Sequence, residues 1–117
     1  TQLTSTSQEK MQNQLLIEKP IENVVMKYAE NAKEAGLDGV VCSPLEVQTV
    51  KKRCGDDFIT VTPGIRFEED DKGDQVRITT PKKAKELGSD YIVVGRPITK
   101  AEAPINAYKK CVEDFVG

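Results

Sequence analysis

The hydrophobic pattern along the 117-residue chain alternates between two kinds of segment. Between Ile21 and Ala35 the apolar residues recur every third or fourth position, the spacing of an amphipathic helix. Gly36 follows the last turn, at the position where a glycine commonly ends a helix. Short and mostly apolar runs are typical of buried strands, and they predict strands over 38–42, 58–62 and 91–94.

Further segments complete the predicted order of elements. The polar segment Thr1–Ser7 is predicted as the end of a first strand, and Met11–Ile17 as a short helix or an irregular turn. Two stretches have the residues of a helix capping box, Ser43–Glu46 and Thr99–Glu102. Helices are predicted over 47–54, 80–88 and 107–115. Four strand–helix units predict an α/β fold with a parallel sheet, either half of an eightfold barrel or a small open doubly wound sheet.

The composition of the chain excludes several classes of function but says little about the fold. The net charge of −2 gives no reason to expect nucleic-acid binding, and no apolar run is long enough to span a membrane. The chain has no histidine, which excludes Ser-His-Asp and Cys-His catalysis within it. Its three cysteines are expected to be reduced thiols of a cytoplasmic protein. No leader is visible, and because the chain opens at Thr1 without a methionine, we expect it to be a piece of a longer protein.

Two predicted strands end in the same chemistry, a glycine followed by an arginine. The first is Val61–Arg66, which contains Pro63 and Gly64, and the second reaches Gly95 and Arg96. Glycine lets a ligand approach the backbone, and arginine offers donors that match a phosphate. In an eightfold barrel the phosphate site is frequently built after the last two strands, whereas no nucleotide-binding glycine motif supports the open sheet. The competing interpretation is that both arginines are ordinary surface residues.

The segment between these strands is long for such a connection, at residues 66–79. It is either a solvated acidic turn or a lid, with Gly73 as its hinge and Gln75 reaching inward, and the spacing favours neither. Thr4, at the end of the first predicted strand, has a hydroxyl that could reach a ligand. No strand end carries a catalytic Lys and Asp pair, since Asp38 and Asp90 precede their strands, on the face that serves stability in barrels.

At these residues the sequence resembles the orotidine 5′-phosphate decarboxylases of the bacterial type. The resemblance extends across the whole chain and is carried by five segments: Thr1–Ser7, Gly36–Pro44, Thr60–Arg66, Gly73–Gln75 and Ile92–Thr99. The last four occur in the family's order and spacing. It implies that residues 1–117 form the C-terminal half of a (β/α)8 barrel, from the end of the fifth strand to the eighth helix.

The resemblance also implies an activity and a set of roles. The family converts orotidine 5′-monophosphate to UMP and CO₂ in pyrimidine biosynthesis, without a cofactor or metal. Arg66, Gly95 and Arg96 would bind the 5′-phosphate, and Gln75 would link it to the pyrimidine. Thr4 would lie against the base and Pro63 would line the pocket.

The family's catalytic D-x-K-x-x-D motif is absent from this sequence. We therefore expect the chain alone to bind without turning over, and to need an N-terminal half of the same enzyme. A half-barrel has open edges, so a homodimer is also expected, and an unstable isolated monomer. Two alternatives remain: a non-catalytic phosphate-binding half-barrel that self-associates, and another phosphate-binding barrel enzyme.

Overall fold

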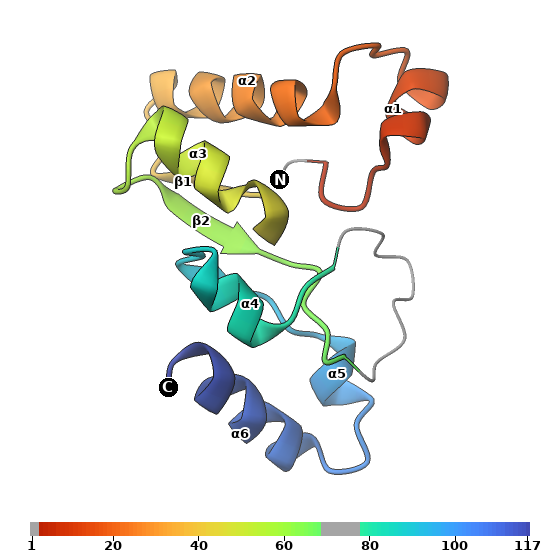
Figure 1. The fold of residues 1–117 in the computed structure, drawn as a ribbon, viewed down its shortest axis with the longest axis vertical. Coiled ribbons are helices and arrows are strands. Elements are labelled where there is room, and N and C mark those ends of the chain that lie inside the picture. The colour runs from red at the N-terminus through yellow and green to blue at the C-terminus, as the bar shows by residue number, and fades with distance from the viewer. Residues whose placement is uncertain (1–2, 69–77) are drawn as a thin grey trace.

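A three-stranded parallel sheet forms the centre of the molecule in a computed structural model, which describes residues 3–68 and 78–117. The strands lie side by side in the order β1-β2-β3, and Figure 1 shows the helices that connect and flank them. The elements are α1 (Gln8–Gln14), α2 (Ile21–Glu34), β1 (Gly39–Val41), the 3₁₀ helix η1 (Pro44–Glu46), α3 (Val47–Cys54), β2 (Ile59–Thr62), α4 (Pro81–Glu86), β3 (Tyr91–Ile92), α5 (Arg96–Thr99) and α6 (Pro104–Phe115).

The strands and most helix ends confirm the sequence pattern. All three strands fall within the predicted ranges, and the pairs β1–β2 and β2–β3 are both parallel. Gly36, Gly55 and Gly88 adopt positive φ angles of 87°, 98° and 90°, the backbone conformation that lets a glycine end a helix. The capping box at Ser43 is present, since the Ser43 hydroxyl accepts from the Leu45 N–H and Glu46 reaches back to the Ser43 N–H, although it opens η1 before α3 begins.

The prediction of a strand end at Thr1–Ser7 is wrong for residues 3–7, and residues 1–2 lie outside the described ones. The Thr6 N–H donates to the Leu3 carbonyl at 3.3 Å and closes a turn. Ser7 then caps α1, where its hydroxyl accepts from the Lys10 N–H at 3.2 Å. Short hydroxyl side chains compete for backbone hydrogen bonds in this way, so the segment forms a turn and a helix cap in place of a strand.

The second predicted capping box, Thr99–Glu102, is also wrong. Thr99 is the last residue of α5, and α6 begins at Pro104 after Ala103, with no side-chain cap. Proline is favoured in the first turn of a helix because its fixed φ suits the helix and its missing N–H costs nothing there. Pro97 and Pro104 therefore decide where these two helices begin.

The main core lies between α2, α3 and the adjoining face of the sheet. Its buried residues are Val25, Met26, Ala29, Cys42, Val47, Val50, Cys54 and Phe58. Gly39 brings β1 close to β2, because a Cβ at this position would lie 2.1 Å from the Ile59 carbonyl oxygen. None of the three cysteines, all of which lie among the described residues, forms a disulfide, and all three are buried.

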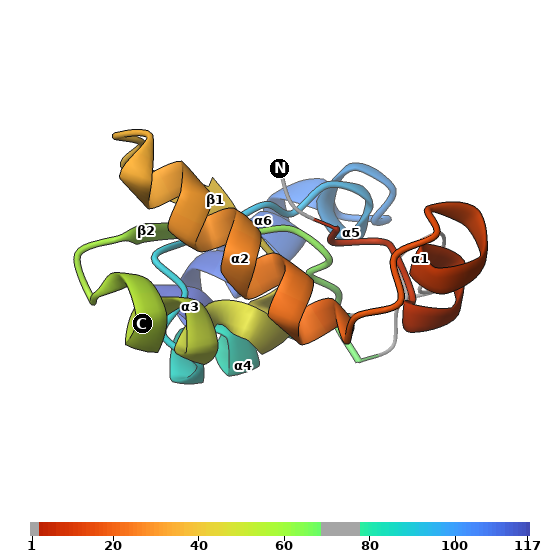
Figure 2. The ribbon, with the colours of Figure 1, turned by 90° about the horizontal axis from the view of Figure 1, so that it is seen from above.

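Within residues 3–68 and 78–117, helices cover one face of the sheet and not the other. On β2, Thr60 and Thr62 are fully buried beneath the helices, whereas Ile59 and Val61, which point to the other face, are partly exposed. Figure 2 shows α3 and α4 together on one side of β2. The molecule is accordingly flat, with principal extents of 42 × 33 × 19 Å.

Candidate functional site

The two glycine–arginine segments follow neighbouring strands and leave the sheet at the same edge. β2 and β3 are parallel, with Val61 opposite Tyr91 and Thr62 opposite Ile92. The Val93 N–H donates to the Thr62 carbonyl at 2.9 Å and extends the ladder by one residue. In Figure 1 the segment after β2 and the start of α5 lie on this side of the molecule. The carboxyl ends of parallel strands are where α/β proteins place their ligands.

Arg66 is held on a fixed stretch of backbone. Gly64 has a φ of 77°, a left-handed conformation that suits glycine, and turns the chain after Pro63. A parallel bridge between Ile65 and Thr79 then closes the base of the long segment, since the Arg66 N–H donates to the Thr79 carbonyl at 2.9 Å and the Thr79 N–H to the Gly64 carbonyl at 3.1 Å. The Arg66 side chain is only 6% exposed, and its Nη1 donates to the Ile65 carbonyl at 2.8 Å. A buried guanidinium is costly unless its donors are satisfied, so this hydrogen bond helps to stabilise Arg66 in its buried position.

Gly95 and Arg96 stand at the start of α5. Gly95 is the N-cap, and a Cβ added there would meet nothing within 4 Å among the described residues. Packing within this part of the chain therefore does not demand a glycine, in contrast to Gly39. Arg96 is exposed, and Pro97 behind it is buried and fixes the turn. Open space next to a backbone amide is what the close approach of a ligand requires.

Phe67 and Lys110 form a contact that the sequence did not predict. The Lys110 Nζ lies 4.3 Å from the centroid of the Phe67 ring, a cation–π distance, and Phe67 is buried. The contact joins the residue after Arg66 to α6, the helix that follows α5. It thereby links the segment that carries Arg66 to α6, the helix that follows the segment carrying Arg96. Phe67 and Lys110 are 43 residues apart in the sequence, so no local pattern could have revealed this contact.

The remaining predicted site residues are less closely grouped. Pro63 is half-buried directly after β2, at the same edge as Arg66. Thr4 is half-buried in the turn before α1, on a separate segment, and its place against a base stays a prediction. Gln75 lies outside the described residues, as does the proposed hinge Gly73.

The opposite end of the sheet carries a polar network of a different kind. Asp90, just before β3, accepts from Lys51 Nζ at 2.5 Å, from the Thr60 N–H at 2.8 Å and from the Thr60 hydroxyl at 3.1 Å. Partial burial by itself raises the pKa of this carboxyl, but the hydrogen bonds from Lys51 and Thr60 outweigh it and hold the pKa below its ordinary value. The network joins α3, β2 and β3, so Asp90 has a structural role, as its position before the strand predicted.

Other kinds of site find no support in the described part of the chain. No group of three or more His, Cys, Asp or Glu side chains is arranged to hold a metal ion within residues 3–68 and 78–117. Over the same residues, no helix has the length and apolar character that crossing a membrane requires.

A parallel sheet with helices on one face, and with both glycine–arginine segments at its carboxyl end, defines the class of the chain: part of a (β/α)8 barrel. Comparison with solved structures supports this class. The chain is similar to the orotidine 5′-phosphate decarboxylase of Lactobacillus acidophilus with a TM-score of 0.80 and 44% identity, covering 100% of this chain and 47% of that one. For the enzyme of Pyrococcus horikoshii the TM-score is 0.64 and the identity 27%, over 83% of this chain and 44% of that one.

Sequence comparison identifies the family. The profile of the orotidine 5′-phosphate decarboxylase / HUMPS family matches residues 1–111. All 117 residues of the chain align with the orotidine 5′-phosphate decarboxylase of Bacillus cereus strain AH187 at 59% identity, and they cover 49% of that protein. The identity to the enzyme of Bacillus cytotoxicus is 58%, again over 117 residues and 49% of that protein. The chain belongs to the orotidine 5′-phosphate decarboxylase / HUMPS family. It spans about half the length of the curated relatives it matches.

Proposed function

We propose that this chain is the phosphate- and pyrimidine-binding half of an orotidine 5′-phosphate decarboxylase, the C-terminal half of the barrel. The assembled enzyme would convert orotidine 5′-monophosphate to UMP and CO₂ in the cytoplasm. The observation that carries the proposal is the placement of Arg66 and Arg96 after neighbouring parallel strands, at one edge of the sheet. The curated relatives with 59% and 58% identity bear the name of this enzyme, which agrees with the proposal.

The proposed roles divide along the chain. Arg66, with Gly95 and Arg96, binds the 5′-phosphate. Charge-assisted hydrogen bonds from a buried guanidinium are strong, and the pinned backbone around Arg66 means that little order is lost on binding. Pro63 lines the pocket beside Arg66, Thr4 contacts the base and Gln75 joins the phosphate to the pyrimidine.

The chemical step needs groups that this chain does not supply. Loss of CO₂ leaves a carbanion on the pyrimidine ring, which requires an adjacent cation for stabilisation and a proton for completion. The phosphate is remote from that carbon, but its binding energy can be used to assemble the site. The missing Lys and Asp would come from an N-terminal half, so that this chain recognises the substrate and its complement transforms it.

Complementation tests the proposal directly. The chain is mixed with the N-terminal half of the Bacillus cereus relative, the part that the similarity does not cover, and decarboxylation is followed by the loss of orotidine 5′-monophosphate absorbance. We expect activity from the mixture and none from either half. UMP binding to this chain is measured separately by calorimetry, with Arg53→Ala as a control for an exposed arginine outside the site.

Two results would contradict this proposal. Turnover by the isolated chain would show that its chemistry is not missing. A mixture that assembles but neither turns over nor binds UMP would remove the assignment of the phosphate site to Arg66 and Arg96.

A further inference from the structure

The segment that carries Thr4 is connected to α2 by one side chain, that of Gln8. Gln8 is the first residue of α1, four positions after Thr4, and it is half-buried. Its Nε2 donates to the Lys19 carbonyl at 3.0 Å, and its Oε1 accepts from the Ile21 N–H at 2.6 Å. Both bonds form in one orientation of the amide, because a carboxamide has one donating and one accepting end. Gln8 therefore joins the first residue of α1 to the first residue of α2.

The acceptor that Gln8 supplies is one that the N-cap of α2 cannot provide. The first N–H groups of a helix have no partner inside the helix, and a Ser, Thr, Asp or Asn at the N-cap usually satisfies one of them. The N-cap of α2 is Pro20, whose ring has no atom that can accept a hydrogen bond. The Ile21 N–H instead donates to Gln8, which lies 13 residues earlier in the chain. The bond thus stabilises the start of α2 and the start of α1 together.

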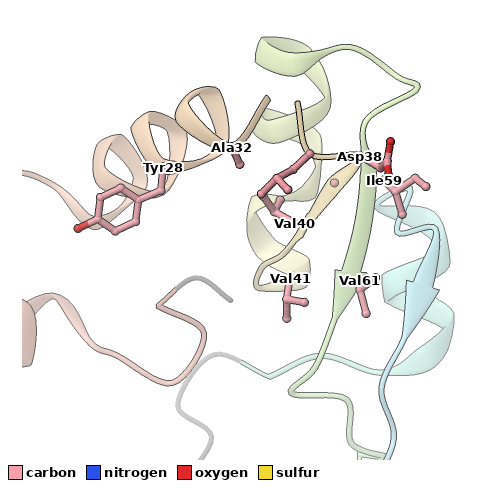
Figure 3. A pocket seen from close by; sticks show the side chains of 9 residues that line it. Tyr28, Ala32, Asp38, Val40, Val41, Ile59 and Val61 are labelled. Atoms are coloured by element: carbon pink, nitrogen blue, oxygen red, sulfur yellow. The ribbon is translucent and has the colours of Figure 1, made fainter. Parts of the chain in front are cut away.

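α2 is itself anchored to the sheet. Val25 and Ala29 on α2 are fully buried in the main core. Ala32, further along the helix, and Val40 of β1 pack against the same core. Figure 3 shows this part of α2 beside β1, with Ala32 and Val40 labelled. A group that is bonded to the start of α2 is therefore held relative to the sheet.

The residues between Thr4 and Gln8 are also hydrogen-bonded. The Thr6 N–H closes a turn, and the Ser7 hydroxyl caps α1. Met11, one turn after Gln8 on the same face of α1, is fully buried. Displacing Gln8 would displace the turn with it, so the position of Thr4 depends on the two hydrogen bonds of Gln8.

α1 lies on the side of the molecule that carries the two glycine–arginine segments. In Figure 1 the β2 arrow points toward the side that holds α1 and α5, and Figure 2 shows both helices toward the same end. Both polar atoms of the Gln8 amide are bonded to backbone groups. Gln8 therefore acts through the segment that it holds rather than by touching a ligand.

We propose that Gln8 is a positioning residue for the pyrimidine base: its two hydrogen bonds hold the Thr4 segment where the base binds. The inference rests on the proposed function, which assigns the base to Thr4 and the phosphate to Arg66 and Arg96. A separate support, the parallel bridge to Thr79, fixes the backbone next to Arg66. Removing the Gln8 amide should therefore weaken recognition of the base and leave recognition of the phosphate intact.

Two ligands separate the base from the phosphate: UMP, and ribose 5-phosphate, which has no base. Calorimetry on the mixture of this chain with the N-terminal half of the Bacillus cereus relative gives the dissociation constant of UMP directly and that of ribose 5-phosphate by displacement of UMP. Gln8→Ala should raise the constant for UMP about tenfold, because the released segment must be ordered when the base binds, and that for ribose 5-phosphate less than about twofold. The matched control is Gln12→Ala, which should change neither constant, since Gln12 is exposed on the same helix.

Conservative variants and hydrogen exchange report on the two hydrogen bonds themselves. Gln8→Glu keeps the acceptor for the Ile21 N–H and should recover part of the UMP affinity, whereas Gln8→Asn, whose side chain is one methylene shorter, should not. In the unliganded chain the Ile21 amide should exchange at least about tenfold faster in Gln8→Ala than in wild type. The Cys42 amide, bonded to the Val61 carbonyl, should keep its rate and show that the sheet is intact.

Several results would overturn the inference. They are an unchanged UMP affinity in Gln8→Ala, equal losses of affinity for UMP and ribose 5-phosphate, a loss of the same size in Gln12→Ala, and an Ile21 amide that keeps its wild-type exchange rate in Gln8→Ala. A failure of the proposed function looks different, because the wild-type mixture then binds neither ligand. The role in base recognition would fail with it, while the exchange rate of Ile21 would still test the bond to Gln8.

Discussion

The amino and carboxyl ends of the sheet differ in how tightly their backbones pack and in which polar groups they carry. At the amino end, Gly39 lets β1 approach β2, and Asp90 collects hydrogen bonds from Lys51 and Thr60. At the carboxyl end, Gly95 has no described atom within 4 Å of where a Cβ would lie, and Arg96 is exposed. The first end satisfies Asp90 through internal hydrogen bonds, whereas the second end carries two arginines, the buried Arg66 and the exposed Arg96. Stability and ligand binding should therefore respond to different substitutions.

A matched pair of glycine substitutions should give the largest contrast. Gly39→Ala forces a Cβ into the Ile59 carbonyl oxygen, 2.1 Å away, and should lower the free energy of unfolding by at least about 4 kcal/mol or prevent folding. Among the described residues, a Cβ at position 95 meets no atom within 4 Å, so Gly95→Ala should cost much less stability while weakening phosphate binding. Urea denaturation measures both. Equal losses of stability would show that the two ends do not differ as described.

Arg66→Ala should weaken UMP binding by about 100-fold, since it removes charge-assisted hydrogen bonds worth about 3 kcal/mol. Arg66→Lys should restore only part of the affinity because lysine lacks the planar fork of donors. Calorimetry on the chain, and again on the mixture of halves, gives the ratio of the UMP dissociation constants of variant and wild type. Unchanged affinity in Arg66→Ala would place the anion elsewhere.

Asp90→Asn should lower stability by about 1 kcal/mol near neutral pH and leave UMP affinity unchanged. The pKa of the Asp90 carboxyl is lowered in the folded state, so its contribution is present above the unfolded pKa of about 3.9 and is lost as pH falls through the folded value. Denaturation at pH 7, 5, 4 and 3 should show the difference between wild type and Asp90→Asn shrinking toward acid. A difference that grows toward acid would contradict the assigned role.

Lys110→Gln should have the smallest effect, a two- to fivefold loss of UMP affinity with little change in stability, because it removes the cation over the Phe67 ring next to Arg66. Lys110→Arg should restore the affinity. Phe67→Leu, combined with Lys110→Gln in a double-mutant cycle, separates the ring contact from the general effect of charge. Fully additive losses would mean that the contact does not position Arg66.

Sequence reasoning predicted what depends on local pattern and missed what depends on distant segments. Apolar runs and helix-ending glycines located the three strands, and the glycine–arginine repeat located Arg66 and Arg96 at one edge. The strand expected at residues 3–7 failed because hydroxyl side chains formed a turn and a cap. The Phe67–Lys110 contact and the Ile65–Thr79 bridge arise from tertiary packing, and no local signal encodes them.

The three buried cysteines can report local opening of the structure, because a buried thiol reacts with a reagent only when it becomes exposed. Cys42 and Cys54 belong to the core between α2, α3 and the sheet, and burial raises the pKa of the Cys54 thiol, which slows its reaction. Cys111 lies on α6 and lines an apolar pocket of about 310 Å³ between this helix and β3. A thiol reagent added to the native chain would therefore report two rates of opening in one molecule. The reaction of Cys42 and Cys54 would follow opening of the core, and that of Cys111 would follow separation of α6 from β3.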